Sequence, residues 1–367
     1  MFKAEELFQN ITDKNHPDET VLTIIQGKGT LPREQAGRNI HYDDASLSNY
    51  KKVEQGDFII HLRSFEGGLE MANEAGIVSP AYTILRCKRP HSSLFYDAYF
   101  HTDEFINHNL SKSVEGIRDG RQISYEAFKW LGIPYCEPTE QEKISNLFAA
   151  LNEGIAKQRD LVESLKKYKR GLLMHYFSDD NTLQWKQYTI SQIGKVITGS
   201  TPPTNDRSNY DGDLLFCSPG DIGDQKYISS TEKRVSPKGF ALGRVIPPSS
   251  VIVTCIGLIG KLGIATTDMI TNQQINALIV SEDFDHEFIY YAFENFFPKY
   301  RSKVSMQTLP ILSKSEFERL LIKVPNLNVQ HKISNYLAGM DKRIEHTQHE
   351  LNMLQELRRG IIQKLFI

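Results

Sequence analysis

Apolar residues recur every three or four positions through two long stretches of the chain, neither of which has an internal proline. In the first stretch, from Thr139 to Phe177, the spacing alternates between four and three residues. The second stretch, from Leu327 to the last residue, shows the same alternation. This spacing is typical of the a and d positions of a coiled-coil seam. It predicts two helices, each about 60 Å long from the rise per residue of an α-helix. So regular a seam requires a partner helix.

Apolar side chains occupy the two seams at equivalent positions. In the first helix they are Ile144, Phe148, Leu151, Ile155, Val162, Leu165 and Leu172, and in the second Ile333, Leu337, Met340, Ile344, Leu351, Leu354 and Ile361. Gln158 and Lys169 interrupt the first seam, and Thr347 and Arg358 interrupt the second at the matching places. Two interpretations of these polar positions remain open: tolerated polar layers, or residues that fix the helix register.

The chain also repeats itself. The segments that begin at Gln141 and Gln330 share the letters K-I-S-N, and the match continues without a gap to Phe177 and Phe366. Towards the N-terminus, the apolar runs at 58–60 and 251–253 match at an offset four residues larger. We therefore expect the first half to contain about four additional residues between positions 100 and 123, in a loop. The aligned positions predict a duplicated architecture with two similar halves.

The region before each long helix has the pattern of a globular domain that mixes strands and helices. In the second half, strand-like runs at 213–216, 251–253 and 275–280 are separated by clusters rich in Pro, Gly, Ser and Asn. An aromatic segment from Glu287 to Phe297 predicts a short helix. The predicted organisation is a globular domain over 1–137, a helix over 138–178, a linker over 179–184, a second globular domain over 185–326 and a second helix over 327–367.

The composition narrows the class of function. Lys and Arg number 43 and Asp and Glu 45, which gives a formal net charge of −2. This argues against a polybasic binder, but not against a nucleic-acid protein that sorts its charges between faces. No apolar stretch has the length of a membrane helix, and the N-terminus lacks the layout of a signal peptide. The four cysteines form no CxxC pair, so we expect reduced thiols in a cytoplasmic protein.

No segment carries a complete catalytic motif. The segment 201–204, Thr-Pro-Pro-Thr, has the prolines of a methyltransferase base-binding loop, but neither its amide or acid nor its aromatic residue. The glycine-rich segment 257–262 lacks the spacing and the Ser or Thr of a phosphate loop. We interpret Asp221, Asp224 and Lys226 as a solvated turn rather than the carboxylate cluster of a nuclease. The sequence thus predicts no catalytic residue and no metal site.

Several stretches of the second half resemble the specificity (S) subunit of type I restriction-modification enzymes. They are Trp185 followed by 193–202, then 218–222, 255–265, 271–276 and 309–317, and the start of the closing helix over 325–330. The resemblance extends over essentially the whole chain and is clearest in the second half. The first half has no counterpart of Trp185 at its opening.

The resemblance implies an α+β fold in which two pseudo-symmetric globular target recognition domains are separated by two long antiparallel coiled-coil helices. Each domain would read one part of a bipartite double-stranded DNA target. The helices would dock two methyltransferase (M) subunits and, through them, the restriction (R) subunits of a prokaryotic defence system. The chain itself would be non-catalytic, and S-adenosylmethionine, ATP and magnesium would bind only to partner subunits. Two alternatives stay open: a solitary or truncated variant of a specificity subunit, and a coiled-coil adaptor without DNA recognition.

Direct reading of bases favours Arg, Lys, Asn and Gln on loops that reach the major groove. Residues of these types on predicted loops are Lys28, Arg33, Arg63, Arg118 and Arg121 in the first half, and Lys261, Asn272, Gln273 and Gln307 in the second. For each of them a structural or solvated role remains the alternative.

Overall fold

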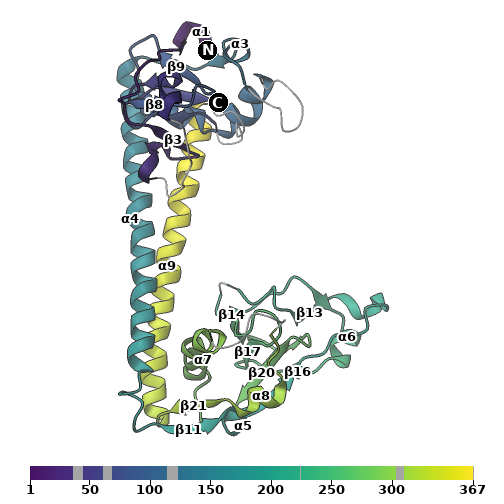
Figure 1. Ribbon diagram of the computed structural model, residues 1–367. Coiled ribbons are helices and arrows are strands. Elements are labelled where there is room, and N and C mark those ends of the chain that lie inside the picture. Colours follow the sequence, from purple (N-terminus) through teal and green to yellow (C-terminus); the bar gives the residue numbers. More distant parts are fainter. Residues whose placement is uncertain (36–43, 61–67, 114–122, 224, 303–309, 367) are drawn as a thin grey trace. The chain divides into compact units, whose positions relative to one another are not determined.

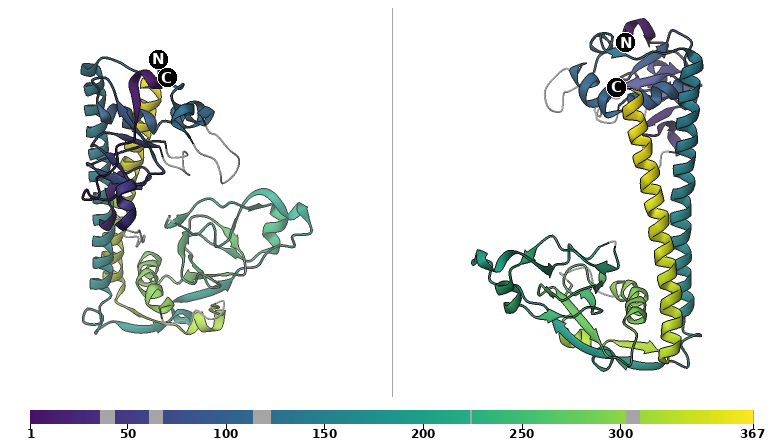
Figure 2. Two further views of the ribbon diagram at one scale, coloured as in Figure 1. Left: turned by 45° about the horizontal axis from the view of Figure 1, so that its top comes forward. Right: turned by 180° about the vertical axis from the view of Figure 1, so that it is seen from behind.

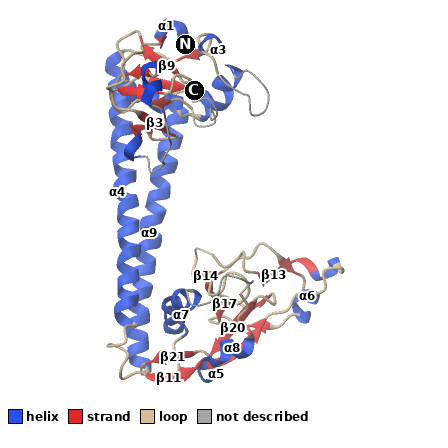
Figure 3. Cartoon of the chain, in the orientation of Figure 1, coloured by secondary structure: helices blue, strands red, loops and turns tan. Residues whose placement is uncertain are grey.

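A computed structural model describes residues 1–35, 44–60, 68–113, 123–223, 225–302 and 310–366. The chain divides into two compact units. Unit 1 consists of Met1–Asp160 and Gln348–Ile367, and unit 2 consists of Leu161–Thr347. Each unit combines strands with helices (Figure 3), and each of the two long helices contributes residues to both units.

The two units share the strand order of a core sheet. In unit 1 the order is β2 (Phe8–Ile11), β9 (Thr83–Cys87), β6 (Phe58–Ile60) and β7 (Glu70–Met71). In unit 2 it is β12 (Gly194–Thr198), β20 (Ile275–Val280), β17 (Val251–Thr254), β18 (Leu262–Ala265) and the edge strand β14 (Tyr227–Ile228). The register matches too, because Phe58 pairs with Leu85 as Val251 pairs with Leu278. The predicted duplication is therefore confirmed in the sheet.

Outside the core sheet the two units differ. Unit 2 has a second sheet of β15 (Arg234–Val235), β13 (Tyr210–Cys217), β19 (Met269–Thr271) and β16 (Val245–Ile246). The described part of unit 1 has instead two strand pairs, β3 (Leu22–Ile25) with β4 (Gly29–Pro32), and β5 (Lys51–Val53) with β8 (Gly76–Val78). Both units add a short antiparallel pair, β1 (Phe2–Lys3) with β10 (Gly132–Ile133), and β11 (Lys186–Thr189) with β21 (Leu321–Val324).

An aromatic helix packs on the core sheet of each unit, α2 (Ser93–Phe100) in unit 1 and α7 (His286–Arg301) in unit 2. Phe95 and Phe288 occupy equivalent places on these helices and both are buried. In unit 1 the centre of the Phe58 ring lies 4.9 Å from that of the Phe100 ring, in an edge-to-face arrangement. This geometry stabilises an aromatic pair in addition to the burial of its apolar area. The strands and the aromatic helix predicted in the second half are confirmed by β13, β17, β20 and α7.

Serine side chains begin the equivalent short helices that precede the last strand of each unit. Ser124 accepts a hydrogen bond from the backbone of Ala127 at the start of α3 (Tyr125–Phe128). Ser313 accepts one from Glu316 at the start of α8 (Lys314–Arg319), where Glu316 completes a capping box. The remaining short helices are α1 (Ala4–Leu7), α5 (Ile190–Ile193), α6 (Pro237–Leu242) and 3-10 turns at Arg33–Gln35, Asp44–Asn49 and Arg207–Asn209.

The described part of the segment between residues 100 and 123 is largely helical, and the expected loop with the additional residues stays a prediction. A π-helix over Glu104–Asn109 and a 3-10 helix over Leu110–Ser113 follow α2, and residues 114–122 lie outside the described ranges. Phe105 and Leu110 are buried in the core of unit 1. Burial of these two apolar side chains holds the segment in helical turns, which the length comparison of the halves could not show.

The long helices α4 (Pro138–Tyr176) and α9 (Leu327–Leu365) lie side by side within each unit (Figures 1 and 2). In unit 1, Arg358 Nε donates to Asn152 Oδ1 at 2.7 Å. In unit 2, Lys169 Nζ lies 2.7 Å from Asp341 Oδ1. Residues late in one helix therefore contact residues early in the other, so the helices run antiparallel.

Most of the predicted seam positions face the partner helix or a domain core. The structure buries Phe148, Ile155, Val162, Leu165, Ile333, Leu337, Met340 and Leu351, and it leaves Ile144, Leu151, Leu172, Ile344, Leu354 and Ile361 partly exposed. Near the C-terminal end of each helix the buried position moves on by one residue, to Leu173 and Ile362, which are 6% and 5% exposed. An α-helix drifts by about 20° per heptad relative to a strict 3.5-residue repeat, which accounts for this shift.

A buried glutamine ties α4 to the aromatic helix of unit 1. The side-chain oxygen of Gln141 accepts a hydrogen bond from the backbone N–H of Ser92 at 3.0 Å, directly before α2. The amide nitrogen of Gln141 donates to the carbonyl of Cys136 at 2.8 Å. One turn further along α4, the hydroxyl of Ser145 lies 2.6 Å from that of Ser92. We call Gln141, Ser145 and Ser92 the helix latch of unit 1.

The helix latch of unit 2 consists of the equivalent residues Gln330, Ser334 and Asp285. Gln330 accepts a hydrogen bond from the backbone N–H of Asp285 and donates one to the carbonyl of Pro325, both at 2.9 Å. The hydroxyl of Ser334 donates to the carboxylate of Asp285, the residue directly before α7. The glutamine and the serine that recur in the sequence repeat are thus the residues that fasten each long helix to its domain.

Removal of a latch glutamine should loosen the junction between helix and domain. In Gln330→Ala, the N–H of Asp285 and the carbonyl of Pro325 lose their buried partner, which costs about 1–3 kcal/mol. We expect hydrogen–deuterium exchange of the segment around Asp285 to show a free energy of opening lower by that amount. The exposed change Lys332→Ala on the same helix turn is the control. Equal protection in the two variants would show that the latch contributes nothing to the junction.

Candidate nucleic-acid interface

Part of the candidate base-reading set can be placed in the structure. Four candidates lie outside the described residues: Arg63, Arg118, Arg121 and Gln307. The others lie on turns, loops or short helices: Lys28, Arg33, Lys261, Asn272 and Gln273. The local geometry separates those whose side chains are available to a ligand from those that shape the fold.

Lys28 lies exposed at the tip of the turn that joins β3 to β4. Its two neighbours, Gly27 and Gly29, have φ angles of 71° and 75°, which glycine adopts without steric cost. Beneath the turn, the buried carboxylate of Glu70 accepts hydrogen bonds from the N–H of Gly27 at 2.6 Å and of Gly29 at 2.9 Å. The backbone of the turn is therefore fixed while the side chain of Lys28 extends from it.

Asn73 holds the same turn from a second side. Its amide donates to the carbonyl of Lys28 at 2.7 Å and to that of Thr30 at 2.9 Å, and its backbone N–H donates to the Thr30 hydroxyl. A side chain presented by a fixed backbone loses little conformational freedom on binding. Sequence reasoning missed Glu70 and Asn73, because each lies more than 40 positions from the turn that it supports.

A half-buried histidine lies beside the Glu70 carboxylate. His101 Nε2 lies 3.6 Å from the Glu70 carboxylate, and His101 Nδ1 donates to the carbonyl of Asp97 at 2.7 Å. Burial alone would raise the pKa of Glu70, but His101 and the two glycine N–H groups outweigh it and lower the pKa. Burial would likewise lower the pKa of His101, but Glu70 and Asp97 outweigh it and raise the pKa.

Arg33 has a structural environment. Its side chain is half-buried, with Nε and Nη1 shielded from solvent. Its guanidinium lies 6.0 Å from the centre of the Tyr50 ring, and its backbone N–H donates to the carbonyl of Val21. This placement favours a packing role for Arg33 over base reading.

In unit 2 three loops meet where β17 ends and β20 begins, and we call residues 218–223, 255–261 and 272–274 the loop cluster. Hydrogen bonds join them: Asn272 N–H donates to the carbonyl of Cys217 at 3.0 Å, and Cys255 N–H donates to that of Gln274 at 2.7 Å. The ammonium of Lys261 lies 3.5 Å from the carbonyl of Pro219. The structure thus brings the described candidates of the second half, Lys261, Asn272 and Gln273, onto neighbouring loops.

The loop-cluster candidates differ in what their side chains do. Asn272 shapes the turn, because its side-chain oxygen accepts from Gln274 N–H at 3.0 Å and its amide donates to the Gln274 side chain. Gln273 is exposed, and its side-chain oxygen accepts from the Thr201 hydroxyl at 2.6 Å. Lys261 is half-buried. Gln273 is therefore more available to a ligand than Asn272 or Lys261.

The glycines of the segment 257–262 lie in the loop cluster, where they allow backbone conformations that other residues rarely adopt. Gly257 and Gly260 have φ angles of 75° and 79°. A Cβ at Gly260 would lie 2.5 Å from the Cβ of Phe297 on α7, so only glycine fits this approach. The turn therefore has a conformational reason for its glycines.

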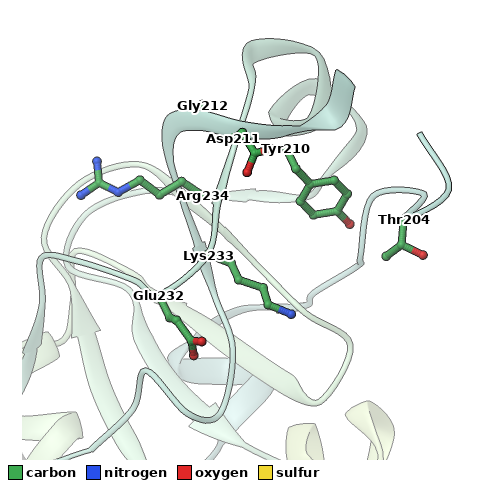
Figure 4. Close-up of a pocket in the computed structure, with 7 residues that line it drawn as sticks. All are labelled: Thr204, Tyr210, Asp211, Gly212, Glu232, Lys233 and Arg234. Atoms are coloured by element: carbon green, nitrogen blue, oxygen red, sulfur yellow. The ribbon is translucent and has the colours of Figure 1, made fainter. Parts of the chain in front are cut away.

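A further open pocket of about 550 Å³ lies beside β13 and β15 (Figure 4). It is lined by Thr204, Tyr210, Asp211, Gly212, Glu232, Lys233 and Arg234. The side chains of Lys233, directly before β15, and of Arg234, its first residue, extend in opposite directions in Figure 4. Sequence reasoning missed this basic pair, although two adjacent cations in a polar stretch were a visible signal.

The interpretation of residues 221–226 as a solvated turn is correct for Asp221 and wrong for Lys226. The carboxylate of Asp221 caps the turn by accepting from the backbone N–H of Ser218 at 2.8 Å. Lys226 is buried, pairs with the carboxylate of Glu287 and donates to the Tyr291 hydroxyl at 2.8 Å. Contacts with α7, which are remote in sequence, remove this lysine from solvent. Asp224 lies outside the described residues.

The described residues include no group of three or more His, Cys, Asp or Glu side chains arranged to hold a metal ion. In the same ranges, no helix combines the length and the apolar composition that a membrane crossing requires.

Comparison with known proteins identifies the relatives of this chain. Residues 183–356 match the family model of the type I restriction modification DNA specificity domain. The MjaIX type I restriction enzyme specificity subunit of Methanocaldococcus jannaschii is 28% identical over 189 residues, which is 50% of this chain and 44% of the relative. The HindI specificity subunit of Haemophilus influenzae is 25% identical over 186 residues, 49% of this chain and 40% of the relative. The aligned stretches thus span less than half the length of these curated relatives.

The fold resembles a solved structure over its whole length. The type I restriction-modification system S subunit from M. genitalium aligns with a TM-score of 0.63 at 15% identity, covering 100% of this chain and 95% of that one. The predicted resemblance to type I specificity subunits is confirmed, and so is the α+β fold class.

The contact between Glu70 and His101 predicts a measurable titration. Because the pKa of His101 is raised on folding, its contribution to stability is complete below the unfolded pKa of about 6.5 and is lost as the pH rises through the raised value. In an NMR titration, His101 should have a midpoint above 6.5 in the wild type and a lower one in Glu70→Gln. The exposed change Lys332→Ala is the control and should leave the His101 midpoint unchanged. The same His101 midpoint in both would refute the pairing.

Proposed function

We propose that this chain is the DNA sequence-recognition subunit of a type I restriction-modification enzyme, because residues 183–356 match the model of the type I restriction modification DNA specificity domain. The observation that carries the proposal is the duplication. Both units have the same core sheet and the same helix latch, whereas the strands and loops around the sheet differ. A common scaffold with different loops suits two readers of two different sequences.

Each unit offers a loop region suited to contact with DNA. In unit 1 it is the β3–β4 turn, where Lys28 extends from a backbone fixed by Glu70 and Asn73. In unit 2 it is the loop cluster, with Gln273 exposed and Lys261 beside it. Lysine and glutamine are among the side chains that read base edges in the major groove. Two such readers of double-stranded DNA imply a bipartite target with non-identical parts.

The helix pair offers two similar surfaces for partner subunits. In unit 1, Leu147 and Leu357 are 43% and 52% exposed, one on each long helix. In unit 2, the equivalent Tyr336 and Tyr168 are 47% and 53% exposed. Exposed apolar side chains at equivalent positions of both units are candidates for protein-binding sites. They support the docking of two methyltransferase subunits, which would in turn bring the restriction subunits into the complex.

Catalysis in this proposal belongs to the partner subunits. S-adenosylmethionine, ATP and magnesium would bind there, and this chain would supply sequence recognition alone. Its near-neutral net charge of −2 fits this division, because contacts to DNA phosphates supply most of the affinity and the methyltransferase subunits would share them.

The proposal predicts that DNA methylation in the cell depends on this chain. Sequencing of methylated bases should find a bipartite motif in cells that contain the chain and its methyltransferase, and the motif should be absent from cells without the chain. Lys28→Ala should weaken binding of DNA that contains the motif by about 1–3 kcal/mol, whereas the exposed change Lys157→Ala on α4 should leave it unchanged.

Two results would contradict this function. A methylation pattern that is identical with and without the chain would leave the coiled-coil adaptor as the better interpretation. Transfer of labelled methyl groups to DNA by the purified chain, in the absence of any partner, would show that it is an enzyme.

A further inference from the structure

Lys169 on α4 and Arg358 on α9 are equivalent in the sequence repeat, and the two units give these cations different partners. In unit 2, the ammonium of Lys169 lies between two carboxylates, 2.7 Å from Asp341 and 2.9 Å from Glu294. Burial alone would lower the pKa of Lys169, but these carboxylates outweigh it and raise the pKa. The charge of this lysine is therefore compensated within the protein.

In unit 1 the equivalent cation lacks both carboxylates. The three positions are occupied by Arg358, Asn152 and His101. Arg358 Nε donates to the side-chain oxygen of Asn152 at 2.7 Å, so its direct partner is a neutral amide. His101 stands where unit 2 has the second acid. The substitution of two acids by an amide and a histidine leaves unit 1 with surplus positive charge at this place.

A pocket of about 630 Å³ opens in unit 1 at this surplus charge. Three arginines line it, Arg159 from α4 and Arg358 and Arg359 from α9, together with His101, Asn152 and a single carboxylate, Asp103. In the described part of the chain, neither Arg159 nor Arg359 forms an ion pair. The volume lies in the range of small-molecule sites, about 300–1,000 Å³.

The acidic groups near the pocket are already engaged. Asp103 accepts a hydrogen bond from the Asn107 amide at 2.6 Å. Glu70 accepts the two glycine N–H groups of the β3–β4 turn, and Asp97 lies 3.5 Å from His101 Nδ1. Asp97 also interacts electrostatically with Arg358, and burial raises the pKa of this carboxyl. Of these three acids only Asp103 lines the pocket, together with the three guanidinium groups.

We propose that this pocket of unit 1 binds a phosphate-bearing ligand. The planar forks of arginine match the oxygens of a phosphate group in bidentate pairs, and charged hydrogen bonds of this kind are about twice as strong as neutral ones. The phosphate belongs either to a free nucleotide or polyphosphate, or to the backbone of DNA. The inference rests on the charge difference between the units, and its DNA alternative rests also on the proposed function.

The test introduces into unit 1, at Asn152, the carboxylate that unit 2 has at the equivalent Asp341. Calorimetric titration of the full chain with inorganic pyrophosphate should show saturable binding, and a parallel arm should use double-stranded DNA. Asn152→Asp places a carboxylate beside Arg358, so it should weaken the affinity for the phosphate ligand at least tenfold. Because the change is nearly isosteric and adds an ion pair, the thermal midpoint should not fall. Arg359→Gln should weaken the affinity as well.

The matched control is Arg170→Gln, the equivalent position of Arg359 in unit 2, which should leave the affinity unchanged. Pyrophosphate binding that DNA does not displace identifies a free phosphate ligand. Displacement of pyrophosphate by DNA, or an effect of Asn152→Asp on DNA binding alone, identifies the DNA backbone. The proposal is overturned if Asn152→Asp and Arg359→Gln change neither arm, or if Arg170→Gln weakens binding as much as Arg359→Gln.

Discussion

The hydrogen bonds at the start of each long helix are the contacts on which the rest of the architecture depends. A long helix with a polar outer face gains stability chiefly from what it packs against, and Gln141 and Gln330 fix where that packing begins. Each glutamine satisfies a backbone N–H just before the aromatic helix of its unit, and that helix in turn covers the core sheet. Orientation of the domain on the helix is thereby set by the same few buried polar groups in both units.

The sequence predicted the parts of the fold that repeat. The K-I-S-N match located the latch serines, and the heptad spacing located the buried Val162 and Leu165. The strict heptad spacing did not predict the shift of the seam to Leu173 and Ile362. The shift arises because each heptad of a straight α-helix rotates slightly relative to a 3.5-residue repeat, and this rotation adds up along the helix. Sequence reasoning also missed the helical turns at 104–113 and the burial of Lys226, since both depend on packing against residues far away in the chain.

For the candidate interface, sequence reasoning selected residue types and the structure sorted them by environment. Lys28 and Gln273 are exposed, whereas Asn272 and Arg33 are engaged within the fold. The supports of the Lys28 turn, Glu70 and Asn73, come from a distant strand and the turn after it. Duplication explains why such differences lie outside the core sheet, because both copies of the scaffold keep the helix latch while the loops around it can diverge. The contacts of the helix pair diverge as well: Arg358 pairs with an amide, whereas its equivalent Lys169 pairs with two carboxylates.

The central claim is that one scaffold, used twice, carries two independent DNA readers. Its most direct test is to exchange residues 185–326 for the matching segment of another specificity subunit and to sequence the methylated motif in cells. The account predicts that one part of the bipartite motif changes and that the other part and the spacing between them are retained. A change in both parts, or in neither, would contradict it.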